Sequence, residues 1–408
     1  MFLKTNKIPF LILAISIVII ALLQLHNGAY HPITRGFDAT GHIDYIHYLQ
    51  DYMRVPLPNE GWELYQPPLY YVVATIIGNL RLVKIVGVFA WTVLLLTSYT
   101  FFKKVIRDTF IAVAGVCIVS FLPVVLYLTP SISNEFFSAV FISIAMAYYV
   151  LHRKLSSLKE QSLLGILLGL SLLAKSTAII LVVAIIVDQL ITNRKEITSL
   201  LKKSIPVVIF FLLISGWFYG RNFYLFHNPI VASFNFPDKY PLHQTVIARD
   251  LNFFFGLVGF INVDMFQAQH YSFLAGTYFS WFYDGHNIIV PVQEFSKIGM
   301  MLVFLSLPIF FLFVYGSIKS LYRHNEISRF LGLYMVILFV GYILYNLRLP
   351  YYSTVKGSFL VSAVIPFCYF VLQGILPYRK HRFIISLYIL LYCLVIMKTF
   401  WILPNWYQ

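Results

Sequence analysis

The chain has 408 residues, of which 60% are hydrophobic and only 11% are charged, and its mean hydropathy is +0.79. This composition excludes an ordinary soluble globular protein and predicts an integral membrane protein with a single domain, residues 1–408. The net charge of +14 does not indicate nucleic-acid binding, because the cations lie in short connections between hydrophobic runs.

The hydrophobic runs predict an all-α bundle of about eleven transmembrane helices, since about 20 apolar residues cross a bilayer as a helix. The first run follows Lys4 and Lys7 and lacks a small-residue cleavage site, so we expect a retained helix rather than a signal peptide. Residues 162–191 form either one long helix or two short ones. The runs lie near 8–25, 85–102, 109–128, 136–151, 162–175, 176–191, 204–220, 298–317, 330–346, 358–376 and 383–401.

Basic residues gather in alternate connections, as the positive-inside rule requires of cytoplasmic loops. We therefore expect a cytoplasmic N-terminus and, with an odd number of spans, an exterior segment 401–408. The three cysteines lie inside predicted helices, which indicates neither a disulfide framework nor a metal site. The basic connections contain Lys103, Lys104, Arg107, Arg153, Lys154, Lys159, Arg194, Lys195, Lys202, Lys203, Lys319, Arg323, Arg329, Arg379, Lys380 and Arg382.

Two long segments, about 26–81 and 222–296, remain on the exterior side, and long ordered loops are more often functional than not. In the first loop, Ile43, Ile46, Leu49 and Met53 recur at helical spacing, with polar residues on the other face. This pattern predicts an amphipathic helix lying along the membrane surface. Function is therefore expected on the exterior face.

Asp38 lies immediately before this surface helix. One interpretation is a helix N-cap, because an Asp side chain accepts hydrogen bonds from the free amides of a first turn. The other is a general base at the membrane surface, with His42, one turn later, bonding to its partner or to a phosphate.

A second acid, Glu135, follows Asn134 in the short exterior turn between the third and fourth spans. It is either a helix start, where negative charge is favourable, or a second carboxylate that shares a cavity with Asp38. In the second case the two acids divide the work of orienting and deprotonating an acceptor.

Five cations lie at the exterior boundary, where the positive-inside rule does not explain them. They either extend to the lipid headgroups or converge on an anionic headgroup such as a lipid phosphate. They are Lys175, Arg221, Arg249, Arg348 and Lys356.

The second exterior loop carries an aromatic run, 279–283, followed by Asp284 and His286. Such aromatics either pack at the interface or stack on sugar faces. Asp284 and His286 are candidates for the acceptor side only. No pair of histidines has the spacing of a zinc site.

Six segments, taken in order, carry one family pattern. They are Asp38, 65–71 with Pro-Pro-Leu-Tyr, 131–135 with the second acid, 172–176 with Leu-Ala-Lys-Ser, 217–222 with Arg-Asn at a helix end, and 356–359 with Lys-Gly-Ser-Phe. The set resembles the GT-C superfamily of membrane glycosyltransferases, in particular the family 39-like group of protein O-mannosyltransferases and aminoarabinose transferases. The likeness covers most of the chain.

The resemblance implies transfer of a sugar, with inversion, from a polyprenyl-phosphate carrier to a hydroxyl or amine of a protein, lipid or glycan acceptor on the exterior face. It implies Asp38 as the general base and Glu135 as the residue that positions the acceptor or a metal. No metal ligand and no certain cofactor is assigned, although a divalent metal is compatible. The implied donor-phosphate contacts are Lys175, Arg221, Arg348, Lys356 and His42, and the implied acceptor or sugar contacts are Asn134, Tyr65, Gln66, Asp284 and His286.

The chain departs from the family pattern at three places. Gln66 stands where the family often has Lys before Pro-Pro, Ala39 stands where several relatives carry a second acid, and only 401–408 follow the last span where many relatives have a soluble domain. The alternatives are a flippase or transporter of a lipid-linked sugar, an enzymatically silent assembly subunit, and a glycan ligase or polymerase that uses a polyprenyl diphosphate. The flippase is less favoured because the acids lie at the exterior edge rather than at mid-membrane.

Overall fold

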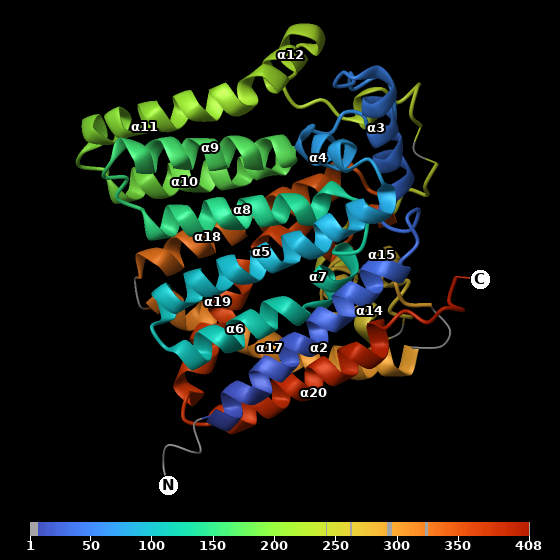
Figure 1. Ribbon diagram of the computed structural model, residues 1–408, viewed down its shortest axis with the longest axis vertical. Coiled ribbons are helices and arrows are strands. Elements are labelled where there is room, and N and C mark those ends of the chain that lie inside the picture. The colour runs from blue at the N-terminus through green and yellow to red at the C-terminus, as the bar shows by residue number, and fades with distance from the viewer. Residues whose placement is uncertain (1–6, 242, 262, 292–295, 323–324, 408) are drawn as a thin grey trace.

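The computed structural model describes residues 7–241, 243–261, 263–291, 296–322 and 325–407. These residues form helices and no strand beyond one isolated bridge between Val246 and Tyr351. The long helices lie side by side between two ends of a bundle, and α3 (Ala39–Tyr52) runs across one end (Figure 1). We call this the α3 end and the other the opposite end. The all-α fold predicted from the sequence is confirmed.

The first hydrophobic run forms α2 (Lys7–Tyr30), which packs against the last helix of the chain. Two short helices, α3 and α4 (Leu69–Ile77), then precede α5 (Leu80–Ile106). In α3 the predicted apolar face is buried through Ile43, Ile46 and Leu49. Met53, however, was predicted on that face and is 84% exposed, because it ends the helix in a left-handed conformation that turns its side chain away.

The run 109–128 forms two helices, α6 (Thr109–Phe121) and α7 (Pro123–Leu128). The break falls at Leu122, whose extended backbone is the conformation that a following proline favours. A turn then leads into α8 (Asn134–Leu151), which the Ser133 hydroxyl caps by accepting from the Glu135 amide. The capped turn places Asn134 and Glu135 at the α3 end.

The pair of runs between 162 and 191 is two helices, α9 (Leu158–Ala174) and α10 (Ile179–Thr192). Lys175 interrupts them in an extended conformation, with φ −162° and ψ 137°, and a short 3₁₀ turn, Ser176–Ala178, starts the return. The interruption leaves the Lys175 side chain at the junction of the two helices.

Helices α11 (Ile197–Phe211) and α12 (Trp217–Phe226) continue one another through a π-helical turn, Leu212–Gly216. Only 6% of the most apolar window of this helix is buried inside the protein. It lies at the edge of the bundle (Figure 1), so its apolar surface is available to lipid.

Four short helices occupy the described part of the second loop: α13 (Leu251–Phe255), α14 (Val258–Ile261), α15 (Ala268–Tyr271) and α16 (Phe273–Phe282). They precede four long ones, α17 (Ser296–Tyr322), α18 (Glu326–Arg348), α19 (Val364–Ile375) and α20 (Arg382–Phe400). Every residue of α19 is buried, which makes it the centre of the bundle.

Helices α17 and α19 cross closely because glycine lies on both sides of the contact. A Cβ at Gly316 would meet the Phe370 carbonyl oxygen at 1.9 Å, and one at Gly374 would meet that of Leu312 at 2.2 Å. Small residues of this kind let membrane helices approach backbone to backbone.

Eight helices of the described chain are long and apolar enough to cross a membrane, which makes this an integral membrane protein. The predicted number of eleven spans and the cytoplasmic N-terminus stay predictions. The first and last described residues do lie at different ends of the bundle: α2 begins at the opposite end, and the residues after α20 reach the α3 end (Figure 1), where Trp401 stacks on His26 at 3.6 Å.

Candidate active site

Asp38 occupies the N-cap position of α3 but does not cap it. Its side chain makes no capping hydrogen bond, and its backbone is left-handed, with φ 53°. Asp is one of the few residues that adopt this conformation readily. The N-cap interpretation is therefore wrong for the side chain, and the exposed carboxylate is left available to another group.

His42 lies one turn further along α3 and is buried. Its Nδ1 is 2.7 Å from the Tyr71 hydroxyl. Burial lowers the pKa of His42 to about 3, so the imidazole is neutral at pH 7 and is able to contact a phosphate only as a hydrogen-bond donor.

Glu63 is a buried acid that the sequence interpretation did not select. Only 4% of its surface is exposed, and its Oε2 accepts a hydrogen bond of 2.8 Å from the Gln66 side-chain amide. A Cβ at Gly41 would lie 2.6 Å from Glu63 Cγ. The absence of a side chain at Gly41 is therefore what lets α3 rest on the Glu63 side chain.

Gln66 connects Glu63 to the start of α8. Its Nε2 also donates to the Tyr65 hydroxyl at 3.0 Å, and its Oε1 accepts from Asn134 Nδ2 at 3.1 Å. The donors and the acceptor of the amide are thus engaged with protein groups. Asn134 in turn lies 3.4 Å from the carbonyl oxygen of Ala174, the residue before Lys175.

Glu135 and Lys175 form an ion pair with Oε1 and Nζ 2.5 Å apart. Both side chains are largely buried, at 10% and 12% exposure. The pair joins the start of α8 to the end of α9, so the second acid and the first of the predicted cations are direct partners.

Lys356 contacts the residue before Asp38: its ammonium group is 4.1 Å from the centroid of the Phe37 ring. It also faces the Phe359 ring at 4.7 Å. His286 meets the edge of Phe37 at 5.3 Å, and its Nε2 is 2.9 Å from the Val355 carbonyl oxygen. Lys356 thus contacts aromatic rings and has no ion pair with an acid of the described chain.

These groups interact electrostatically as one set, which we call the acid–cation cluster. Burial raises the pKa of Glu63 to about 8. The Asp38 carboxylate adds to this rise, and the Gln66 hydrogen bond, Lys175 and Lys356 oppose it. His42 responds to the same three charges. The cluster consists of Asp38, His42, Glu63, Glu135, Lys175 and Lys356.

The two predicted arginines have other contacts. Arg221 donates to the Val55 carbonyl oxygen at 3.2 Å, and its guanidinium lies 5.0 Å from the Phe218 ring centroid. Its buried Nε has no partner in the described chain. Arg348 ends α18 and lies 4.8 Å from the Phe234 ring centroid. In the described chain neither arginine bonds to a member of the cluster, although Tyr345, one turn before Arg348, interacts electrostatically with Asp38, Glu63 and Glu135.

Backbone amides hold the side chain of Asp284. Its two oxygens accept hydrogen bonds of 2.6–2.8 Å from the amides of Ile288, Ile289 and Val290. The side chain is fully buried, and these bonds satisfy it. The carboxylate predicted to contact the acceptor is therefore occupied by backbone amides, and we assign it no part in the proposed reaction.

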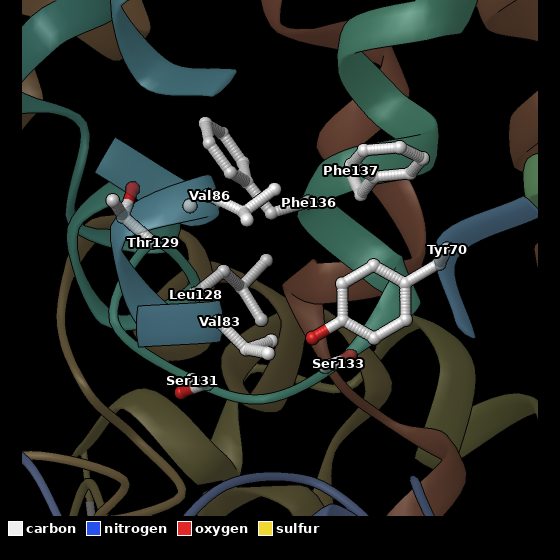
Figure 2. Close-up of a pocket in the computed structure, with 10 residues that line it drawn as sticks. Tyr70, Val83, Val86, Leu128, Thr129, Ser131, Ser133, Phe136 and Phe137 are labelled. Carbon is white, nitrogen blue, oxygen red and sulfur yellow. The ribbon is translucent and has the colours of Figure 1, made fainter. Parts of the chain in front are cut away.

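A small cavity lies against the turn that precedes α8, and no member of the cluster lines it (Figure 2). Its volume is about 10 Å³, room for about one water molecule. It is too small for a sugar, so it is a packing void. Its lining is Tyr70, Val83, Val86, Gly87, Leu128, Thr129, Ser131, Ser133, Phe136 and Phe137.

In the described part of the chain, no group of three or more His, Cys, Asp or Glu side chains has an arrangement that would hold a metal ion. The cluster instead combines carboxylates, an imidazole and lysines from the start of α3, the 63–66 loop, the start of α8, the α9–α10 junction and the segment before α19. The one signal that would have found Glu63 is its place two residues before 65–71, the segment that matches the family pattern.

The fold is similar to that of ArnT from Cupriavidus metallidurans in two crystal structures. In the apo state the TM-score is 0.54 at 12% identity, over 92% of this chain and 60% of that one. In the structure bound to undecaprenyl phosphate the TM-score is 0.55 at 14% identity, over 91% and 60%. No family model and no curated protein matches the chain. The ArnT-like fold confirms the fold predicted from the GT-C resemblance, and this chain spans three fifths of the ArnT length.

Proposed function

We propose that this protein transfers a sugar from a polyprenyl-phosphate carrier to an acceptor hydroxyl or amine at the α3 end, with inversion at the anomeric carbon. The observation that carries the proposal is the Asp38 carboxylate, which makes no capping bond and follows Phe37, the ring that Lys356 contacts, in a fold similar to ArnT. The structural likeness to ArnT bound to undecaprenyl phosphate supports the class of donor.

Asp38 is the general base of the proposed reaction. The acceptor oxygen or nitrogen attacks the anomeric carbon while the bond from that carbon to the phosphate oxygen breaks. The acceptor proton passes to Asp38, and the bonding electrons stay on the phosphate. A carboxylate that caps a helix would be engaged, whereas that of Asp38 makes no capping bond.

Lys356 stabilises the departing phosphate, because it is cationic, 6% exposed and without a carboxylate partner in the described chain. A cation held against aromatic rings in a largely dry site acts on developing negative charge more strongly than one in water. His42, which is uncharged, donates a hydrogen bond to the same phosphate. Arg221 and Arg348 approach the lipid phosphate from the edge of the site.

Glu135 and Asn134 hold the acceptor side together with Tyr65 and His286. The ion pair with Lys175 fixes the Glu135 carboxylate at the start of α8. In this proposal Lys175 faces the donor phosphate while it stays paired with Glu135, so it is not an isolated cation. Gln66 positions its neighbours and does not contact the substrate.

Two donor classes separate this proposal from its alternatives. Purified protein in nanodiscs is given a panel of polyprenyl-monophosphate sugars or polyprenyl-diphosphate glycans, and release of the polyprenyl phosphate or diphosphate is measured. Release from a monophosphate donor supports the proposal. Release only from the diphosphate would assign a ligase or polymerase. Movement of intact lipid-linked sugar across liposomes, without release from either donor, would assign a flippase.

A further inference from the structure

Glu63 is the one acid of the cluster with no role in the proposed reaction, although its surroundings are specific. It is almost fully buried between Gly41 of α3 and the Gln66 amide. Burying an acid costs free energy unless the carboxyl group is protonated or its charge is compensated by hydrogen bonds and nearby cations.

Its contacts form a continuous chain through three separate elements. Glu63 accepts from Gln66, Gln66 accepts from Asn134, and Asn134 donates to the Ala174 carbonyl. The chain runs parallel to the ion pair of Glu135 with Lys175. It therefore ties the loop under α3 to the same two helix ends that the ion pair joins.

We propose that Glu63 is a positioning residue: bonded to Gln66 and packed under Gly41, it sets the distance between Asp38 on α3 and the Glu135–Lys175 pair. The inference rests on the proposed function. It assigns to Gln66 the role of a connector that transmits this constraint, which agrees with the engagement of the Gln66 amide by protein groups alone.

The neutral form of Glu63 fits this role. The charged groups that act on it are Asp38, Lys175 and Lys356. Its other titratable neighbours are Tyr65, Tyr71 and Tyr345, and His42 responds to the same three charges. Because its pKa is raised to about 8, Glu63 is protonated at pH 7 and ionises as the pH rises through that value. Ionisation places a second negative charge beside Asp38, which pushes the two acids apart.

The test compares Glu63→Gln, which keeps the shape and the acceptor oxygen, with Glu63→Ala, which removes both. With a donor that the native protein uses, Glu63→Ala lowers kcat by about 10- to 100-fold, because the Gln66 amide loses its buried partner. Glu63→Gln stays within about threefold of the native rate and loses the decline in kcat above pH 8. Equal rates for Glu63→Ala and native protein, or a Glu63→Gln variant as slow as Glu63→Ala, would overturn the proposal.

A second measurement does not depend on transfer. The infrared spectrum of native protein at pH 7 contains the carbonyl band of a protonated carboxyl group, which disappears above pH 8 and is absent from Glu63→Gln. An identical pH difference spectrum in the variant overturns the assignment. If no donor is turned over by native protein but this band is present, the proposed function fails while the protonated state of Glu63 stands.

Discussion

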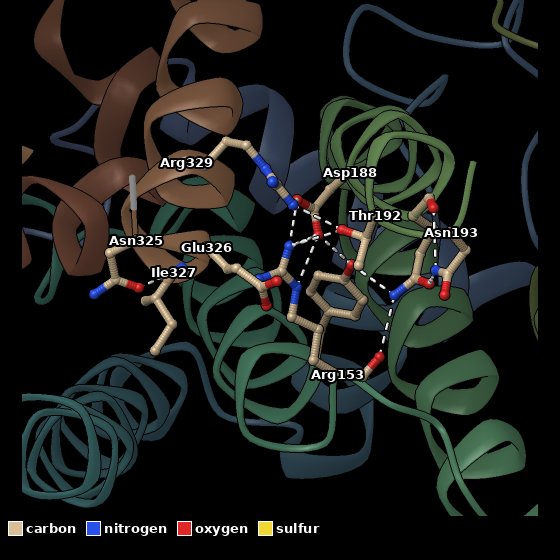
Figure 3. Close-up of polar contacts among 10 residues, drawn as sticks. Arg153, Asp188, Thr192, Asn193, Asn325, Glu326, Ile327 and Arg329 are labelled. Carbon is tan, nitrogen blue, oxygen red and sulfur yellow. Dashed lines mark hydrogen bonds and ion pairs between the residues drawn. The ribbon is translucent and has the colours of Figure 1, made fainter. Parts of the chain in front are cut away.

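Two charged clusters lie at opposite ends of the same helices and are built differently. At the opposite end, Asp188 of α10 is fully buried and accepts hydrogen bonds from Tyr149 at 2.6 Å, Arg153 at 2.5 Å and Arg329 at 3.2 Å (Figure 3). At the α3 end, the Asp38 carboxylate accepts no hydrogen bond from the described chain. The carboxylate of Asp188 is thus satisfied by hydrogen bonds from its neighbours, and that of Asp38 is not.

This difference in hydrogen bonding indicates that the cluster at the opposite end stabilises the fold. A buried charge is tolerated when its hydrogen bonds are complete, and Asp188 joins α8, α10 and α18 at a single point. An open space of about 420 Å³ adjoins Arg153, but the guanidinium already contacts Asp188, Thr192 and Glu326. The charges at the opposite end thus satisfy one another and clamp the helices together. At the α3 end, Asp38 and Lys356 have no ion pair in the described chain, and it is there that we propose the substrate binds.

The strongest test of this contrast is Asp38→Asn. The amide retains the shape of the side chain but accepts no proton, so we expect the rate of sugar transfer to fall by about 10²- to 10⁴-fold. The measurement is release of polyprenyl phosphate by folded, monodisperse protein. Asp44→Asn is the matched control, because Asp44 is an exposed acid on the same helix. Unchanged transfer by Asp38→Asn would remove the general base from the proposal.

The opposite prediction holds for Asp188→Asn. Removing one partner from a buried ion pair typically costs about 3–5 kcal/mol, because the remaining charges are left uncompensated. We expect a large loss of thermal stability in a fixed detergent, while transfer per folded molecule changes by less than about twofold. Asp51→Asn, an exposed acid of α3, serves as the control. A stable but inactive Asp188→Asn protein would show that the clamp belongs to the reaction.

Lys356→Gln sharpens the assignment within the α3 end. A hydrogen bond to a charged phosphate is worth about 1.5–3 kcal/mol, so affinity for undecaprenyl phosphate should fall by about 10- to 100-fold. Lys356→Arg keeps the charge and most of the affinity, and Lys104→Gln, at an exposed position in the last turn of α5, leaves it unchanged. Binding is measured by titration in nanodiscs. Equal affinity in Lys356→Gln would place the phosphate elsewhere.

Much of the fold follows from hydrophobic runs, because each membrane helix must be apolar along its own length. The runs do not predict where a helix is locally interrupted. The break at Leu122, the π turn at Leu212–Gly216 and the exposed Met53 depend on packing between segments. The extended backbone at Lys175 likewise decided between one helix and two.

The site was predictable where a residue stands out by its place along the chain. Glu135 and Lys175 each lie at the end of an apolar run, and Asp38 lies immediately before the amphipathic helix of the first loop. Their partners were not predictable, because the pair of Glu135 with Lys175 and the bond of Gln66 with Asn134 join residues 40 and 68 positions apart. Glu63 was missed for the same reason, since only the folded loop buries it.

The smallest effect is expected at a third ion pair, Arg54 with Glu60, whose side chains are 50% and 27% exposed. Hydrogen bonds from Arg54 lower the pKa of Glu60 to about 2, so the pair stabilises the fold above pH 4.5, and this contribution disappears as the pH falls from 4.5 toward 2. Water screens the charges, so Glu60→Gln should cost about 0–1 kcal/mol at pH 7. Thermal unfolding of both proteins across this pH range is the measurement. A loss as large as that of Asp188→Asn would mean that burial does not set the strength of these clusters, and the contrast between the two ends would fail.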